Sequence, residues 1–160
     1  AATTPGAATS TTTPYGSFEP ELNIPQLVDA AGACYVARWT AFHVKQLEKS
    51  MTEALKKKGF RFIEVLSPCP TLYGRRNGYA DGLAQMKEYK EMAKVKNGAP
   101  TYEVAITHGQ PIIVGKFVDR DRPDYLTLMR SQLGANYHEI AEVGVGCGDE
   151  SEGKEGCCSC

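Results

Sequence analysis

Residues 23–70 alternate the signals of helix and strand with short connections, and this alternation restricts the fold more than any other feature. Asn23 is a favourable helix N-cap and Pro25 suits a first helical turn, so a helix is predicted that ends at Gly32. Residues 34–37 predict a short strand, and Arg38 to Thr40 are expected to form the loop that follows it.

A second helix and a second strand follow in the same order. Residues 42–58 place apolar side chains at helical spacing and end in a lysine cluster before Gly59. Residues 60–66 predict a strand, which the sequence Ser-Pro-Cys-Pro at 67–70 interrupts. The alternation predicts an α/β fold with a largely parallel sheet flanked by helices.

The remaining sequence carries weaker signals. We expect a loop at 74–78, a surface helix at 83–96, a strand at 112–118 and a helix over 123–133. Four segments are expected: a Thr/Pro/Gly-rich segment at 1–22, an α/β core at 23–77, a helix-strand-helix extension at 78–141 and an acidic, cysteine-rich tail at 142–160.

Composition excludes several classes of protein. The chain is 42% hydrophobic and 23% charged with a net charge of −1, which argues against a disordered, collagen-like or strongly basic chain. No run approaches the ~18 apolar residues of a membrane span. We therefore expect neither a nucleic acid nor a membrane as partner.

The six cysteines are unevenly placed. Four of them, Cys147, Cys157, Cys158 and Cys160, fall in the last 14 residues. Their spacing matches no zinc site, which needs two separated pairs of ligands, although binding of a metal or cluster remains an alternative. The tail is expected to be disordered and solvated.

Two loops are candidates for a binding site, because ligands of open α/β sheets bind beyond the carboxyl ends of the strands. The loops are those that begin at Arg38 and at Ser67. Two prolines flank Cys69 and hold its backbone stiff, which suits a thiolate aimed at a fixed target. From the residues alone, however, a buried structural cysteine is the preferred interpretation of Cys69 as well as of Cys34.

The other residues add no catalytic motif. The three histidines, His43, His108 and His138, are far apart and are interpreted as surface or capping residues. The P-loop, the dinucleotide fingerprint and the nucleophile elbow are absent. Spacing alone supports only part of an α/β protein.

Several strings taken together resemble one family. They are Thr-Thr-Pro at 3–5, Thr-Thr-Thr-Pro-Tyr-Gly at 11–16, Ala-Ala-Gly-Ala-Cys-Tyr-Val-Ala-Arg-Trp-Thr at 30–40, Phe-Ile-Glu-Val-Leu-Ser-Pro-Cys-Pro at 62–70, Gly-Arg-Arg-Asn at 74–77 and Val-Asp-Arg-Asp-Arg-Pro at 118–123. From about Thr3 to Leu133 the sequence is similar to the beta subunit of 2-oxoacid:ferredoxin oxidoreductases, most closely to the 2-oxoglutarate branch.

The resemblance implies the C-terminal part of a thiamine diphosphate-binding domain. It implies oxidative decarboxylation of 2-oxoglutarate to succinyl-CoA, with coenzyme A as acyl acceptor and ferredoxin as electron acceptor. Pyruvate and branched-chain 2-oxoacids are the alternative substrates. The implied cofactors are thiamine diphosphate, Mg²⁺ and a 4Fe-4S cluster. The implied partners are an alpha subunit, with gamma and delta subunits where the complex has them, and the implied location is the cytoplasm.

Site residues follow from the resemblance, residue by residue. Cys69 corresponds to the family's cluster ligand in the Ser-Pro-Cys-Pro turn. Thr3 and Thr4 would run near thiamine diphosphate or along a subunit interface. Arg38, Arg75 and Asn77 would meet coenzyme A, the substrate carboxylate or a partner subunit; ordinary surface ion pairs are the alternative.

The sequence also departs from the family pattern. The family's other three cluster cysteines and its Gly-Asp-Gly…Asn motif for Mg²⁺ are not found here. We therefore expect a piece of a longer protein that begins after the segment binding the cofactor phosphate and is inactive alone, with no catalytic residue of its own. A second hypothesis is a non-catalytic electron-transfer or metal-binding module that uses the cysteine tail.

Overall fold

The structure is a computed structural model, and it describes residues 4–133. The chain falls into two units, Ala1–Tyr125 and Leu126–Cys160. Thr3, His138 and the predicted tail at 142–160 lie outside the described residues.

The alternation of helix and strand predicted for residues 23–70 is confirmed. Helix α1 (Ile24–Ala30), strand β1 (Tyr35–Thr40), helix α2 (Val44–Lys56) and strand β2 (Arg61–Leu66) follow one another. The oxygen of the Asn23 side chain accepts a hydrogen bond from the amide of Gln26, as expected of an N-cap. The remaining elements are a π-helical turn η1 (Pro70–Gly74), helix α3 (Gly82–Met92), strand β3 (Ala93–Val95), a 3₁₀ turn η2 (Thr101–Glu103), strand β4 (Ile112–Asp119) and helix α4 (Tyr125–Leu133).

The sheet has four strands in the order β2-β1-β4-β3. The pairs β1/β2 and β3/β4 are parallel, and β4 runs antiparallel to β1. The largely parallel sheet is thus confirmed, with one antiparallel pairing that the sequence did not indicate. Strands from the predicted core and from the predicted extension join in the same sheet.

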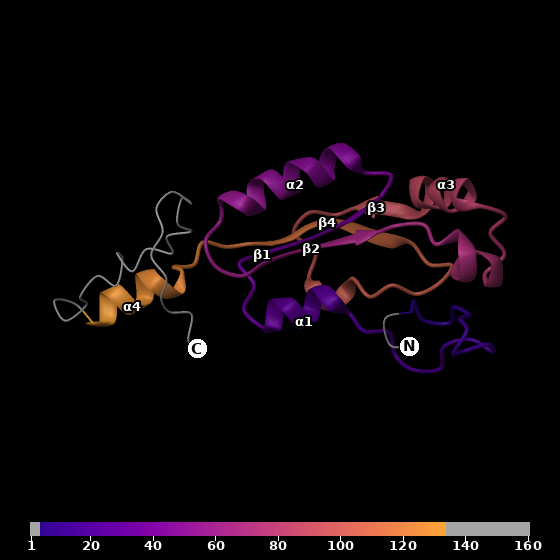
Figure 1. The fold of residues 1–160 in the computed structure, drawn as a ribbon, viewed down its shortest axis with the longest axis horizontal. Coiled ribbons are helices and arrows are strands. Elements are labelled where there is room, and N and C mark those ends of the chain that lie inside the picture. The colour runs from indigo at the N-terminus through magenta and orange to yellow at the C-terminus, as the bar shows by residue number, and fades with distance from the viewer. Residues whose placement is uncertain (1–3, 134–160) are drawn as a thin grey trace, which may run out of the picture. The chain divides into compact units, whose positions relative to one another are not determined.

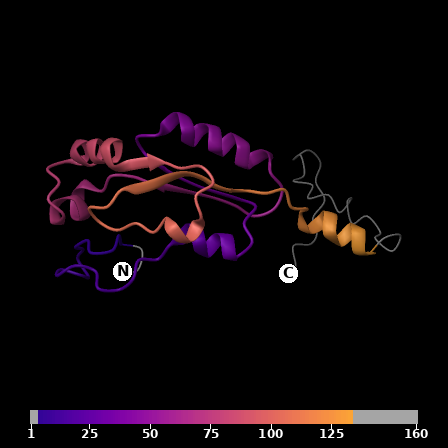
Figure 2. The same cartoon turned by 180° about the vertical axis from the view of Figure 1, so that it is seen from behind.

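Helices cover both faces of the sheet. Helices α2 and α3 lie on one face and α1 lies on the other, together with η2 (Figure 1; Figure 2 from behind). Strand β1 is buried along its whole length, with Tyr35, Ala37 and Trp39 packed in the cluster that includes Ala54 of α2. Val36 packs in the cluster on the other face. A central strand covered on both faces explains the nearly continuous apolar run in this part of the sequence.

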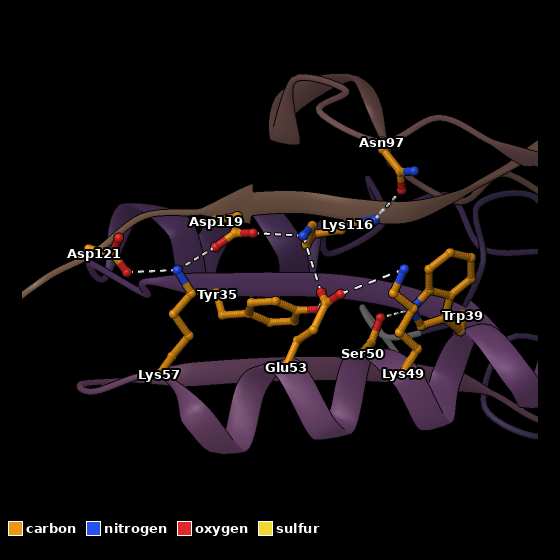
Figure 3. Close-up of polar contacts among 10 residues, drawn as sticks. All are labelled: Tyr35, Trp39, Lys49, Ser50, Glu53, Lys57, Asn97, Lys116, Asp119 and Asp121. Carbon is orange, nitrogen blue, oxygen red and sulfur yellow. Dashed lines mark hydrogen bonds and ion pairs between the residues drawn. The ribbon is translucent and has the colours of Figure 1, made fainter.

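A polar network joins α2 to the face of the sheet that this helix covers (Figure 3). Lys116 of β4 forms ion pairs with Glu53 at 3.2 Å and with Asp119 at 2.6 Å. Asp119 also pairs with Lys57 at 2.7 Å. The hydroxyl of Tyr35 donates to Glu53 at 3.2 Å. These bonds fasten the C-terminal half of α2 over β1 and β4.

Two predicted boundaries are wrong. Residues 38–40, expected as a loop, belong to β1, because pairing with β2 extends the strand through Thr40, and Arg38 also pairs with β4. The helix expected over 83–96 ends at Met92, where the chain turns into β3 and pairs with β4. Tertiary pairing overrode local propensity in both places.

The segment before α1 is hydrogen-bonded to the loop that precedes β4. Gly6 forms a parallel bridge with Thr107, with its amide donating to the carbonyl of Ile106 at 3.1 Å. Ala8 is fully buried. Backbone hydrogen bonds of Gly6 therefore help to hold a segment that has few apolar side chains.

None of the helices in the part of the chain that the structure describes is both long and apolar enough to cross a membrane.

Candidate functional site

A cleft of about 390 Å³ opens at the end of the sheet where β1 and β2 finish. The end of β2, the turn after it, helix α3, the loop before β4 and the N-terminal segment contribute side chains. Its lining includes Thr4, Glu21, Glu64, Cys69, Tyr73, Tyr79, Gln85, Glu88, Tyr89 and His108. This is the position at which open α/β sheets bind ligands.

Cys69 stands at the start of the π-helical turn η1, where Pro70 follows it. Its side chain is exposed and lines the cleft, so the interpretation of Cys69 as a buried structural cysteine is wrong. Backbone amides of Tyr73, Leu72 and Thr71 donate toward the sulfur and hold the pKa of the Cys69 thiol below its usual range. The turn thus presents a sulfur that is stabilised as the thiolate, the form that binds metals.

Gln85 holds the turn from α3. Its side chain is only 2% exposed, and its Oε1 accepts a hydrogen bond of 2.9 Å from the amide of Cys69. The carbonyl of Cys69 accepts from the amide of Gly74 at 2.8 Å. A Cβ at Gly74 would lie 3.0 Å from that carbonyl oxygen, which explains a glycine there. Both backbone groups of Cys69 are therefore fixed.

Three aromatic rings form one wall of the cleft. Tyr73 and Tyr79 stack with their centroids 6.4 Å apart, and His108 meets both rings edge-on. Burial raises the pKa of Tyr73 to about 12, helped by the nearby Glu88, and burial likewise raises the pKa of Tyr89 to about 12. The tyrosines are therefore neutral hydrogen-bonding groups at physiological pH.

The charge of the cleft is negative. Its lining contains Glu21, Glu64 and Glu88 but, among the described residues, neither lysine nor arginine. Two of these carboxylates have internal partners, since Glu21 accepts from Thr107 at 2.8 Å and Glu64 accepts from Arg38 at 2.6 Å. A phosphate group would find no cation among these side chains.

The fit to the three expected cofactors differs. Cys69 suits one ligand position of a 4Fe-4S cluster, which needs four. Cys34 and Cys69 are the free cysteines that the structure describes, and nowhere in residues 4–133 do three or more Cys, His, Asp or Glu side chains gather as metal ligands. The described residues therefore do not fit the diphosphate of thiamine diphosphate or its Mg²⁺.

Arg38 was expected on a loop, and that expectation is wrong. It lies within β1 and is 1% exposed, pairing with Glu64 and donating to the carbonyl of Val104. Its guanidinium also lies 5.9 Å from the ring centroid of Phe117. Because every one of these partners is internal, Arg38 stabilises the sheet and helps to position Glu64 at the cleft.

Asn77 and Arg75 follow η1. The Asn77 side chain pairs with the backbone of Thr9, since its Oδ1 accepts from the Thr9 amide at 2.9 Å and its Nδ2 donates to the Thr9 carbonyl at 3.0 Å. Asn77 thus anchors the N-terminal segment. Arg75 is exposed and is not among the residues that line the cleft.

Among the other predicted residues, Thr4 lines the cleft and Cys34 is fully buried, as expected of a core cysteine. His108 was interpreted as a surface or capping residue but lies in the cleft wall. His43 does precede α2 at the capping position, yet it is buried, with Nδ1 2.8 Å from the hydroxyl of Thr40.

Sequence reasoning missed the aromatic wall and Gln85. These residues belong to a turn, a surface-like helix and a loop that no periodic pattern connects. Their one shared signal is tyrosine enrichment over 73–89, which does not by itself indicate a site.

The chain is similar in sequence to known proteins. It is 42% identical over 122 residues to the 2-oxoglutarate synthase subunit KorB of Methanothermobacter marburgensis, covering 76% of this chain and 42% of that protein. It is also 42% identical over 124 residues to KorB of Methanocaldococcus jannaschii, covering 78% of this chain and 46% of that protein. The chain thus spans somewhat less than half the length of these curated relatives. No family model matches it.

A solved structure supports the fold. The chain resembles, with a TM-score of 0.61 and 23% identity, a chain of a 2-oxoglutarate:ferredoxin oxidoreductase from Magnetococcus marinus determined with 2-oxoglutarate, coenzyme A and succinyl-CoA bound. The match covers 84% of this chain and 47% of that one. The resemblance carried by the short sequence strings is confirmed: the chain is similar to 2-oxoglutarate synthase KorB subunits and to beta subunits of 2-oxoacid:ferredoxin oxidoreductases.

Proposed function

We propose that this chain is part of the beta subunit of a 2-oxoacid:ferredoxin oxidoreductase. In this role it contributes to the oxidative decarboxylation of 2-oxoglutarate to succinyl-CoA with reduction of ferredoxin. The observation that carries the proposal is the position of Cys69, exposed at the carboxyl end of the sheet in a turn whose amides stabilise its thiolate. The names of the relatives, 2-oxoglutarate synthase subunits, support the choice of substrate.

Cys69 is proposed as one of the four ligands of a 4Fe-4S cluster. A cluster there would accept and pass on electrons one at a time. This chain's own contribution is to hold the sulfur in place: Gln85 and Gly74 fix the backbone of Cys69, and amides of η1 face the sulfur. The other three ligands are proposed to come from the rest of the subunit.

Thiamine diphosphate and Mg²⁺ are proposed to bind mainly to the rest of the complex. The acidic cleft suits the uncharged or cationic rings of the cofactor better than its diphosphate, because no lysine or arginine is among its described lining residues. Thr3 and Thr4 are proposed to run beside the rings, a position that the place of Thr4 in the cleft lining supports.

Arg75 is the proposed contact for coenzyme A or a partner subunit, because its exposed guanidinium follows the cleft turn. The proposed partners are an alpha subunit, gamma and delta subunits where the complex has them, coenzyme A and ferredoxin, and the proposed location is the cytoplasm. The chain alone is expected to be inactive.

The test is the Cys69→Ser variant in the assembled complex. We expect loss of the cluster signal in electron paramagnetic resonance and loss of 2-oxoglutarate-dependent ferredoxin reduction by at least roughly 100-fold. Cys34→Ser is the matched control: its sulfur is buried and donates to the carbonyl of Lys58 at 2.9 Å, a bond that serine can make. Full activity and an unchanged cluster signal in Cys69→Ser would refute the proposal.

The substrate is tested in the same complex. We expect the highest kcat/KM with 2-oxoglutarate. A higher kcat/KM with pyruvate or with a branched-chain 2-oxoacid would show that this other 2-oxoacid is the substrate. The electron-transfer or metal-binding module built on the cysteine tail has no supporting observation, because the tail lies outside the described residues.

A further inference from the structure

Strand β2 forms one edge of the described sheet, with β1 as its neighbour on the inner side. The carbonyl of Phe60 accepts from the amide of Cys34 at 2.8 Å, so the backbone of residue 60 faces β1. Backbone groups alternate in direction along a strand. The amides and carbonyls of Arg61, Ile63 and Val65 therefore face away from β1.

This edge lacks the protection that exposed edges usually carry. Natural edge strands are blunted by lysine, proline or unpaired charges, and β2 contains neither lysine nor proline. Its two charged residues have internal partners: Arg61 donates to the carbonyl of Lys57 at 2.7 Å, and Glu64 pairs with Arg38. Nothing in the sequence of β2 opposes the addition of a strand.

An apolar groove runs beside the edge. It is lined by Met51, Ala54 and Leu55 of α2 and by Arg61 and Ile63 of β2. Met51 is 46% exposed and Leu55 is 78% exposed, and their spacing of four residues puts both on one side of the helix. An apolar stripe next to an open strand edge is the surface that a further strand-and-helix unit of an α/β sheet would cover.

We propose that the edge of β2 and the groove beside α2 bind a further β-strand, parallel to β2, and that this strand belongs to the part of the beta subunit that this chain does not contain. The inference rests on the proposed function. It is supported by length, because the chain spans 42% and 46% of its two KorB relatives. The parallel direction follows from the β1/β2 pair, which helices cover on both faces.

A second copy of the chain is the competing occupant. A two-fold dimer would pair β2 with β2 of the partner in the antiparallel direction. In such a dimer the edge of β2 would already be paired, so the proposed strand from the rest of the subunit could not bind there. The experiment therefore compares the 160-residue chain with a full-length chimaera, in which the matched region of KorB from Methanothermobacter marburgensis is replaced by the corresponding residues of this chain.

The hydrogen-exchange rates of individual amides show whether the outward-facing amides of β2 are hydrogen-bonded. In the isolated chain we expect the amides of Ile63 and Val65 to exchange near the rate of an unstructured peptide, and those of Phe62 and Glu64 to be protected by β1. In the chimaera we expect exchange at Ile63 and Val65 to slow by at least roughly 100-fold. Unslowed exchange at these two amides in the chimaera would overturn the proposal.

A pair of substitutions separates the backbone from the side chain. Proline at an edge position whose amide faces outward is tolerated, so Val65→Pro should leave the melting temperature of the isolated chain within a few degrees. The same change in the chimaera removes the amide that the added strand needs, and we expect loss of the slowed exchange at Ile63. Val65→Ala keeps the amide and should preserve that protection in the chimaera.

The remaining outcomes are distinguishable. If the isolated chain sediments as a dimer with Ile63 and Val65 protected, and Val65→Pro returns it to a monomer, the occupant is a second copy and the proposal is wrong. Hydrogen exchange is measured without cofactors, and turnover is measured separately in the assembled complex. A chimaera whose edge amides are protected but whose complex has no turnover overturns the proposed function alone. Conversely, a complex that loses turnover on Cys69→Ser while the edge amides exchange freely overturns this inference alone.

Discussion

The side-chain oxygen of Gln85 lies 2.9 Å from the backbone nitrogen of Cys69, and this bond joins α3 to the turn that presents the sulfur. In Gln85→Leu the Cys69 amide keeps no acceptor in a half-buried place. We expect a loss of about 1–3 kcal/mol in the free energy of unfolding, measured by urea denaturation of the isolated chain. Gln85→Glu keeps an acceptor oxygen and should lose less; equal losses would contradict this role for the bond.

The ion pair between Arg38 and Glu64 predicts strongly non-additive substitutions. Glu64→Leu leaves a buried guanidinium without its carboxylate, and we expect it to cost about 3–5 kcal/mol. Adding Arg38→Met removes the stranded charge, so the double variant should be more stable than Glu64→Leu alone. A double-mutant cycle from urea denaturation measures the coupling, and additive effects would show that the pair is not a unit.

The network around Lys116 predicts a dependence of stability on pH. Hydrogen bonds from Lys116 hold the pKa of Asp119 and of Glu53 below their ordinary values of 3.8 and 4.5. A lowered carboxyl pKa adds stability above the ordinary value and loses it as the pH falls through the lowered one. These groups therefore stabilise the fold above about pH 5 and cease to do so in stronger acid.

Lys116→Met should accordingly reduce the change in unfolding free energy between about pH 6 and pH 3. Because these side chains are about a third exposed, the reduction should not exceed about 1 kcal/mol. Lys49→Met is the matched control, since Lys49 is 80% exposed and lies 4.0 Å from Glu53 (Figure 3). An equal effect of both substitutions would refute the assignment to Lys116.

Asn77→Ala should release the N-terminal segment. The substitution removes the bonds to both backbone groups of Thr9 and the bond from Nδ2 to the carbonyl of Tyr73. We expect limited proteolysis between residues 10 and 19 to be roughly 10-fold faster. Thr9→Ala keeps the backbone bonds and should have a much smaller effect, so equal cleavage rates in the two variants would contradict the anchor.

The sequence predicted the elements that follow local rules. Asn23, Pro25 and Gly32 mark the ends of α1 where capping chemistry requires them, and helical spacing predicted α2, which ends at Lys56, before the predicted stop at Gly59. The sheet order was not predictable, since the antiparallel entry of β4 beside β1 depends on contacts between residues about 80 positions apart.

The site was predictable only where a residue has local chemistry. Cys69 is marked by the prolines on either side of it, and that position was predicted. Arg38 has the sequence context of a loop cation, yet the partners that bury it, Glu64 and Val104, come from distant segments. For the same reason the aromatic wall of Tyr73, Tyr79 and His108 could be found only from the three-dimensional structure.

The anchoring of the N-terminal segment has a consequence for synthesis on the ribosome. The hydrogen bond of Thr9 cannot form until Asn77, 68 positions later, has been synthesised. The bond of Glu21 likewise requires Thr107, 86 positions later. Contacts of such long range form late because the intervening chain must first be ordered. The threonine-rich segment is therefore among the first of these residues to be translated and among the last to be placed, which leaves it open to proteases and chaperones in the interval.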